Sequence, residues 1–294
     1  MKKEGNICLC LTIAANEAAL DAIGDFCLGM FEAAVEQSVD APLLRVFLEC
    51  QAGEESTIVA RLENYGRELA GFMDIAPPRI DMEILPDQDW GSRWKEHFHP
   101  FTLTPGLVIA PTWEQYAARP GEKVIVMDPG MAFGTGHHAT TAMAATLTIT
   151  AVEEGAATVL DVGCGTGILA MTAALFGAKR VMAIDNDSLA VEAARHNILA
   201  NNLAKQLVAG NDDIADLPGV FQLVIANIIH DVLVALAADL SRLTAPGGVL
   251  IVSGILVGEQ EESIFKQFRS HGFTPRDRHH QGEWAALRLD KKVS

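Results

Sequence analysis

Long apolar runs are missing from this chain of 294 residues, and none reaches the roughly 18 residues that a bilayer-spanning helix needs. The sequence therefore predicts a protein that does not cross a membrane. The segment after the first two lysines soon becomes polar and has no clear cleavage site, so we do not expect a signal peptide. These absences favour a cytoplasmic protein.

Cysteines and basic residues are also few. The 5 cysteines are odd in number and lie mostly in apolar runs, which indicates buried thiols in a reducing compartment, not disulfides or metal ligands. The chain has 22 basic and 38 acidic residues and a net charge of −16 at pH 7. That balance disfavours direct binding to nucleic acid, whose phosphates need Lys and Arg. It suits a basic protein partner, although an ordinary solvated acidic surface would have the same composition.

Residues 1–86 have the pattern of a small α+β unit. Hydrophobic spacing predicts the order βαββαβ, which is typical of a ferredoxin-like domain. We expect strands over 6–14, 30–37, 43–50 and 79–85, and helices over 16–28 and 54–70. No residue in this segment has an evident catalytic role, so we expect it to recognise a substrate. A purely stabilising role is the alternative.

Residues 87–101 differ in character from both neighbours. Trp90, Trp94 and Phe98 recur at four-residue steps with charged residues between them, and Pro100 follows. This spacing predicts a short amphipathic helix that ends at the proline and links two domains. The helix could pack on the second domain or act as a hinge.

The stretch over 158–185 has the pattern strand, glycine turn, helix, strand. Its turn reads Asp161-x-Gly163-x-Gly165-x-Gly167, and Asp185 stands at the end of the second strand. Glycines let the backbone approach a ligand closely, and an acid at a strand tip can accept hydrogen bonds from two ribose hydroxyls. The spacing differs from the G-x-G-x-x-G of dinucleotide-binding proteins. It resembles motif I of class I methyltransferases, which use S-adenosylmethionine; a glycine-rich turn in an unrelated α/β protein is the alternative.

The alternation of strands and helices continues over 102–294. It predicts a doubly wound Rossmann-like α/β sheet whose ligand lies at the carboxyl ends of the strands. Asp161, Asp185 and Asn227 all stand at such ends. The last two runs, over 273–280 and 283–289, suggest an antiparallel hairpin at the edge of the sheet.

A glycine-rich loop over 128–141 precedes the first strand of that sheet and contains His137, His138 and Thr141. Its length and glycines suit a lid over a ligand. A zinc site at the two histidines is conceivable. Adjacent histidines alone make a poor chelate, however, and no cysteine or histidine partners lie nearby, so we expect no metal.

Several of these stretches together resemble the bacterial ribosomal protein L11 methyltransferase (PrmA) family: DWGSRWKEHFHPF, DPGMAFGTGHHATT, VLDVGCGTGILA, AIDNDSLAVEAARHN, VIANIIHDVL and GGVLIVSGIL. The resemblance covers essentially the whole chain and is weakest over 1–86. It implies an S-adenosylmethionine-dependent enzyme that methylates lysine and N-terminal α-amines of the large-subunit protein L11, which the first domain would recognise. Ala139 stands where the family commonly has proline. We expect a monomer.

The resemblance and the glycine motif together place the cofactor contacts at Thr141, Asp161, Gly163, Gly165, Gly167, Asp185 and Asn227. Asn227 can accept a hydrogen bond from the reacting amine, or its side chain can cap the next helix. His138 is a candidate helper in the chemistry, and a structural loop histidine is the alternative.

The sequence Asn227-Ile228-Ile229-His230 lacks the aromatic residue of the N-P-P-Y motif, which stacks on planar amines. An aliphatic amine is therefore the expected substrate. Methyl transfer from a sulfonium mainly requires that nucleophile, methyl group and sulfur be aligned. Three alternatives stay open: a lysine methyltransferase with another protein substrate, a non-catalytic cofactor-binding module, and a nicotinamide dehydrogenase, which the glycine spacing disfavours.

Overall fold

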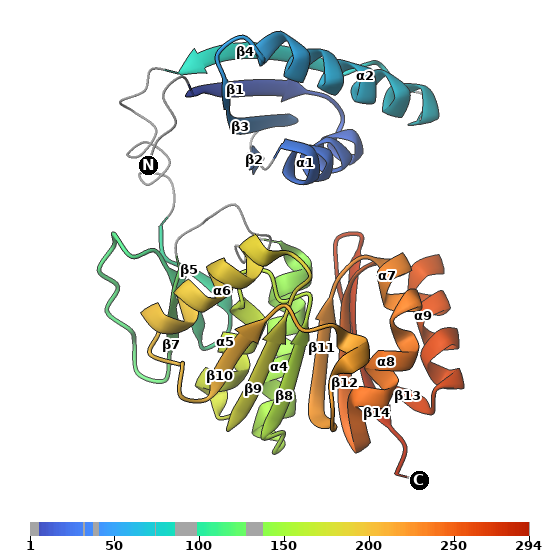
Figure 1. Cartoon of the computed structure of the whole chain (residues 1–294). Coiled ribbons are helices and arrows are strands. Elements are labelled where there is room, and N and C mark those ends of the chain that lie inside the picture. Colours follow the sequence, from blue (N-terminus) through green and yellow to red (C-terminus); the bar gives the residue numbers. More distant parts are fainter. Residues whose placement is uncertain are drawn as a thin grey trace. The chain divides into compact units, whose positions relative to one another are not determined.

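The computed structural model describes residues 6–31, 33–37, 41–73, 75–85, 99–127 and 138–293. The backbone divides into two compact units, Met1–Phe98 and His99–Ser294 (Figure 1). Residues 87–98 of the expected linker helix lie outside the described residues, as does most of the expected glycine-rich loop. The predicted boundaries after residues 86 and 101 therefore remain predictions.

The first unit contains a four-stranded antiparallel sheet with the order β2-β3-β1-β4. β1 lies between β3 and β4 and pairs with both, which is the arrangement expected for a ferredoxin-like βαββαβ chain. The predicted ferredoxin-like unit is thus confirmed. Its elements are β1 (Asn6–Ala14), α1 (Glu17–Phe31), β2 (Ala34–Gln37), β3 (Leu43–Gln51), α2 (Glu55–Met73) and β4 (Arg79–Leu85).

The first helix is longer than the sequence pattern predicts. It continues through Phe31, so β2 begins at Ala34 and not at residue 30. Aromatic packing explains the difference: Phe26 stacks on Tyr65 with ring centroids 4.0 Å apart, and Phe31 packs edge-on against Phe26 at 5.7 Å. Such contacts stabilise a further helical turn at positions that local alternation assigns to a strand.

The second unit is built on a seven-stranded sheet with the order β10-β9-β8-β11-β12-β14-β13. The five strands from β10 to β12 in this order are parallel. β14 pairs in antiparallel orientation with β12 on one side and with β13 on the other. The predicted doubly wound sheet with a C-terminal hairpin at its edge is confirmed. The strands are β8 (Thr158–Val162), β9 (Arg180–Ile184), β10 (Leu207–Gly210), β11 (Phe221–Asn227), β12 (Thr244–Leu256), β13 (Phe273–Gln281) and β14 (Trp284–Lys291).

Helices cover both faces of this sheet (Figure 1). Val159 belongs to the apolar cluster formed with α4, α5 and α6, whereas its neighbour Leu160 belongs to the cluster formed with α7, α8 and α9. This alternation follows from the opposite directions of successive side chains in a strand. The helices are α4 (Ala139–Glu153), α5 (Ile168–Phe176), α6 (Ser188–Ala200), α7 (His230–Ala235), α8 (Ala237–Leu243) and α9 (Glu259–Ser270).

A small three-stranded sheet of β5 (Phe101–Thr104), β6 (Leu107–Ala110) and β7 (Lys123–Val126) precedes α4. The apolar runs over 107–110 and 123–127 predict two strands, which β6 and β7 confirm, whereas β5 was not predicted. The side chain of Asn201 fixes β7 to the end of α6, because its Oδ1 accepts from the N–H of Val126 at 2.8 Å and its Nδ2 donates to the carbonyl of Val126 at 2.7 Å.

Arg288 of β14 is a buried cation, with 1% of its surface exposed. Its guanidinium donates to Glu154, the C-cap residue of α4, and to Asp290 at 3.3 Å. This contact also holds the pKa of the Glu154 carboxyl below its usual range. The interactions of the Arg288 guanidinium therefore fix the end of α4 to the C-terminal hairpin.

We predict that Glu154→Gln lowers the free energy of unfolding at pH 7 by about 1 kcal/mol or less, because Glu154 is partly exposed. A depressed carboxyl pKa contributes stability above the unfolded value of about 4.3, and this contribution is lost as the pH falls through the folded pKa. Urea unfolding at pH 7 and pH 3 should therefore show a gap between the two proteins that closes in acid. Glu153→Gln, at the exposed neighbouring position, should show no such gap.

Candidate active site

The polar residues at strand ends meet where the chain reverses its direction across the sheet. From β8 the chain runs outward to β9 and β10, and then returns to β11 on the other side of β8. Ligands of doubly wound sheets bind in the crevice that this reversal opens at the carboxyl ends. Asp161, Asp185 and Asn227 belong to or directly follow the three strands at that point, as the sequence predicts.

The turn after β8 requires its glycines. Gly163, Gly165 and Gly167 have φ angles of 70°, 52° and 78°, in the left-handed region that residues with a Cβ avoid. A Cβ on Gly163 would lie 2.5 Å from Cγ2 of Ile228, and one on Gly167 would lie 3.2 Å from Cβ of Ala194. The turn is therefore tight on both sides, against the segment after β11 and against α6.

Asp161 is a carboxylate inside the fold, with 1% of its surface exposed. Its Oδ2 accepts from the N–H of Ala170 in α5 at 3.0 Å, whereas its Oδ1 has no hydrogen-bond partner among the described residues. Burial raises the pKa of this carboxyl to about 7, and the nearby charge of Asp185 acts in the same direction. The buried Oδ1 can therefore accept a hydrogen bond that none of the described residues donates.

Asp185 has a structural task besides the predicted ribose contact. Its Oδ2 accepts from the N–H of Gly165 at 2.9 Å, and its Oδ1 accepts from the N–H of Asp187 at 3.0 Å. The carboxylate thus joins the glycine turn to the start of α6. Each oxygen keeps a second lone pair, so further donors can still be accepted.

Thr141 and Asn227 approach each other across the crevice. Thr141 lies in the first turn of α4 with 1% of its surface exposed, and the Nδ2 of Asn227 is 3.4 Å from its hydroxyl. The Oδ1 of Asn227 is buried and has no partner among the described residues. The alternative that Asn227 caps the next helix is not favoured, because the N-cap residue of α7 is Ile229 and no side chain bonds there.

His138 is the N-cap residue of α4. Its Nδ1 is 2.6 Å from Oγ1 of Thr140 and 3.4 Å from the N–H of the same residue, and its ring packs edge-on against Trp284 at 4.8 Å. This geometry supports the structural alternative for His138. A part in the chemistry remains a prediction.

Ser253 and Gly254 are two residues of this site that the sequence reasoning missed. Ser253 is fully buried beside Asn227 in the sheet, and its hydroxyl lies 3.1 Å from the carbonyl oxygen of Thr140. Gly254 has φ 84°, and a Cβ there would lie 2.7 Å from the carbonyl oxygen of Ile228. The end of β12 thus holds both the first turn of α4 and the segment after Asn227.

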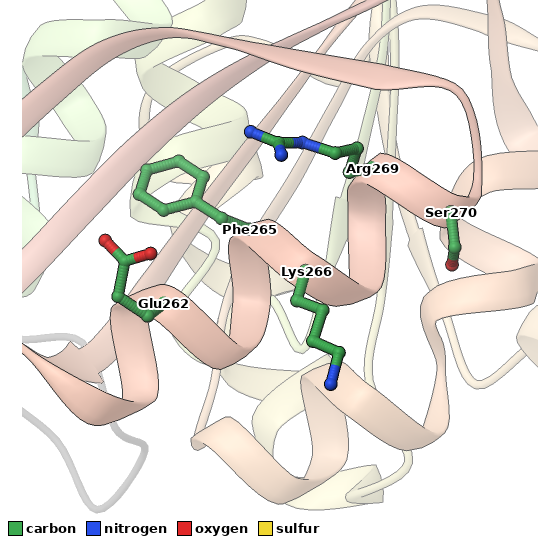
Figure 2. Close-up of a pocket in the computed structure, with 5 residues that line it drawn as sticks. All are labelled: Glu262, Phe265, Lys266, Arg269 and Ser270. Atoms are coloured by element: carbon green, nitrogen blue, oxygen red, sulfur yellow. The ribbon is translucent and has the colours of Figure 1, made fainter.

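A hollow of about 330 Å³ lies elsewhere, on α9. Figure 2 shows the residues that line it: Glu262, Phe265, Lys266, Arg269 and Ser270. All five come from one helix, and none belongs to a turn that follows a parallel strand. This hollow therefore lacks the backbone approach and the converging acceptors found at the strand ends.

Membrane-spanning helices and metal clusters are two further features that would bear on function. In the part of the chain that the structure describes, no helix is long and apolar enough to cross a membrane. Within the same residues, no three His, Cys, Asp or Glu side chains are grouped so that they could hold a metal ion. His137 lies outside the described residues, and the expected absence of zinc remains a prediction.

Comparison with known proteins decides the family. Residues 27–292 match the family model described as "Ribosomal protein L11 methyltransferase (PrmA)". A protein of that name from Desulfotalea psychrophila is 42% identical in an alignment of 291 positions that covers 96% of this chain and 97% of the relative. The chain belongs to the ribosomal protein L11 methyltransferase family.

Other members of the PrmA family agree with this assignment. The Geobacter metallireducens protein is 44% identical over 232 residues, covering 78% of this chain and 75% of its own length. The crystal structure of a ribosomal protein L11 methylase from Lactobacillus delbrueckii subsp. bulgaricus is 32% identical, with a TM-score of 0.61. That match covers 66% of this chain and 100% of the other. The resemblance seen in the sequence motifs is confirmed.

PrmA enzymes take their methyl group from S-adenosylmethionine. The residues of this crevice fit that cofactor, because it offers donors and positive charge and they offer acceptors. Asp161 and Asn227 each leave one buried oxygen without a donor among the described residues, and Asp185 retains lone pairs. The glycine turn adds close backbone approach next to these oxygens.

We predict that Asp161→Asn makes the fold more stable at pH 8 and weakens cofactor binding. A carboxyl whose pKa rises from about 3.9 unfolded to about 7 folded binds protons more tightly in the folded state, so stability falls as the pH rises through that window. At about 1.4 kcal/mol per pKa unit, the loss by pH 8 is at most about 4 kcal/mol.

Urea unfolding between pH 5 and pH 8 checks this expectation. The wild-type curve should slope downward with pH, and the Asp161→Asn curve should be flatter. Asp212→Asn, at an exposed position, is the control and should keep the wild-type slope. Parallel slopes for wild type and Asp161→Asn would show that Asp161 is ionised throughout.

Proposed function

We propose that this chain transfers methyl groups from S-adenosylmethionine to lysine side-chain amines and the N-terminal α-amine of ribosomal protein L11. The observation that carries the proposal is the 42% identity to a ribosomal protein L11 methyltransferase over nearly the whole of both chains. The acceptors gathered at the strand ends support it, because they suit a sulfonium cofactor and an incoming amine.

The cofactor supplies an electrophilic methyl group, and the residues of the chain position the reactants. Asp185 holds the glycine turn and accepts from ribose hydroxyls, while Asp161 offers its unpartnered oxygen to a donor. Thr141 orients the amide of Asn227 through the 3.4 Å contact, which leaves Oδ1 of Asn227 to accept an N–H of the substrate amine. These contacts align the amine with the methyl carbon, which is the main requirement of the reaction.

The amine must lose its proton before it can attack. The pKa of lysine is about 10.4 and that of an α-amine about 8, and desolvation next to a cation lowers both. Solvent then takes the proton, so no general base is required. His138 remains a proposed helper for moving the proton outward, although its Nδ1 is already engaged by Thr140. The absence of an aromatic residue after Asn227 favours an aliphatic amine over a planar one.

We further propose a division of labour along the chain. The first domain, residues 1–86, recognises the substrate, residues 87–101 link the domains, and residues 102–294 bind the cofactor and catalyse transfer. The residues proposed to bind the cofactor all lie within the second unit, and the proposed state of the protein is a monomer. A ribosomal protein substrate and 5 cysteines that form no disulfide suit the cytoplasm. The net charge of −16 suits a basic protein and disfavours direct nucleic-acid binding.

We predict that Asp185→Ala weakens S-adenosylmethionine binding about tenfold or more, since hydrogen bonds to a charged group are lost. Asp185→Asn keeps the size and one acceptor, so it should lose less. Titration calorimetry measures both affinities, and circular dichroism checks that each variant is folded. Equal affinity of wild type and a folded Asp185→Ala would place the ribose elsewhere.

Mass spectrometry of ribosomal proteins tests the proposed substrate. Protein from cells that lack this enzyme should carry unmethylated L11, and purified enzyme with labelled cofactor should restore the methyl groups. Label on ribosomal RNA alone, or on another protein, would contradict the assignment.

A truncated chain that begins at His99 should still bind the cofactor but should not methylate intact L11. Full activity of the truncated chain would leave the first unit a stabilising role only.

A further inference from the structure

Two large apolar side chains in the segment that follows Asn227 are exposed to solvent. Ile229 is 67% exposed and Val232 is 39% exposed, although Leu233 in the same helix is fully buried. Ile229 is the N-cap residue of α7, and Val232 follows three residues later, so both lie toward the start of that helix. Exposed apolar side chains beside a catalytic crevice suit contact with a partner.

A third exposed apolar residue follows the neighbouring strand. Val257 is 41% exposed and comes directly after β12. The two strand ends are close, because Asn227 pairs with Ser253 and a Cβ on Gly254 would lie 2.7 Å from the carbonyl oxygen of Ile228. Ile229, Val232 and Val257, here called the Ile229 surface, therefore belong to the same edge of the sheet.

The turns at this edge carry only negative formal charge. The described residues that directly follow β9, β10, β11 and β12, up to the first residues of the next helix, include no Lys or Arg. Exposed acids occur in each of them: Asp187, Asp212, Asp213, Asp231 and Glu259. Basic residues lie instead at or just before the starts of β9 and β10, at the opposite edge of the sheet: Lys179, Arg180 and Lys205.

Three arginines contact elements next to these acidic turns, and each has a partner in the fold. Nη2 of Arg242 donates to the carbonyl of Ile214 at 2.7 Å and to Oδ1 of Asp239 at 3.0 Å. Nε of Arg195 donates to the carbonyl of Ala209 at 2.9 Å. Arg278 of β13 pairs with Glu261 at 3.4 Å. Because Arg195, Arg242 and Arg278 are all engaged within the fold, they add no free cation to the turns around Asn227. A positively charged partner therefore meets complementary charge there.

We propose that the Ile229 surface, with the acidic turns around it, docks the positively charged segment of the protein substrate that carries the target amine. Apolar groups of that segment cover Ile229 and Val232, its basic residues face the acids, and its amine reaches Asn227. This inference rests on the proposed function and adds to it the part of the catalytic unit that selects the segment around the amine.

The substitution Ile229→Ser tests the docking surface without weakening the helix. Serine is a favoured N-cap residue, so the start of α7 should gain a hydrogen bond. Leu199→Ser is the matched control, because Leu199 is 66% exposed on α6 and is not part of the Ile229 surface. Steady-state kinetics with L11 and calorimetry with S-adenosylmethionine are measured for both variants and the wild type.

We expect Ile229→Ser to raise the KM for L11 about fivefold or more, because apolar burial with the partner is lost. The cofactor Kd should not change, and Leu199→Ser should resemble the wild type in both quantities. The KM of the wild type should also rise with ionic strength, as charge complementarity requires. The pair Asp212→Asn and Glu259→Gln should weaken that dependence, whereas Glu153→Gln should leave it intact.

The outcomes separate this inference from the function on which it rests. A wild-type enzyme that transfers no methyl to L11 overturns the proposed function and this surface with it. An active wild type with an unchanged KM in Ile229→Ser overturns the docking surface alone. A concentration-dependent dimer in light scattering that Ile229→Ser abolishes would assign the surface to a second copy of the chain, and would likewise overturn the proposal.

Discussion

The bond from the N–H of Gly165 to the carboxylate of Asp185 is the contact on which the crevice depends. It joins the turn after β8 to the end of β9, 20 residues along the chain, at 2.9 Å. The three glycines of the turn have no side chains to fix it, so acceptors and donors from neighbouring elements define its shape: the carboxylate of Asp185, and Nδ2 of Asn197, which donates to the carbonyl of Thr166 at 3.0 Å. The same carboxylate accepts from Asp187, whose side chain caps α6. One acidic residue thereby sets the turn and orients the following helix, and it still retains capacity for a ligand.

A second constraint holds the other side of the crevice. Ser253 contacts the first turn of α4, and its carbonyl accepts the N–H of Ile228 at 3.1 Å. Thr141 and Asn227 therefore face each other because β12 fixes both of the segments to which they belong. Residues that touch no ligand can thus determine catalytic geometry, since alignment within fractions of an ångström governs transfer rates.

The fold and the identities of the strand-end residues could be predicted because their signals are local. Glycine spacing, apolar runs and caps extend over a few residues, and they gave the order of elements and Asp161, Asp185 and Asn227. Ser253 could not be recognised, because its partner Thr140 is 113 residues away and its strand looks ordinary. The spacing of Leu233, Ala237 and Leu240 predicts one helix over 231–243, because it stays helical across the break between α7 and α8. The structure has two helices there. β5 was missed because four residues beside an aromatic stripe give little periodicity.

The candidate site contains buried polar atoms without partners and strained backbone, and both are unfavourable for folding. Buried oxygens of Asp161 and Asn227 lack donors among the described residues, and three successive glycines at alternate positions adopt left-handed φ. Each feature costs free energy in the folded chain. The apolar layers next to it offset that cost, because Leu160, Ile225 and Leu250 in the central strands are fully buried. Asp161 and Asn227 lie near the carboxyl ends of β8 and β11, and the strained glycines follow in the turn after β8. The chemistry of the site can therefore depend on these groups while the rest of the sheet supplies the stability.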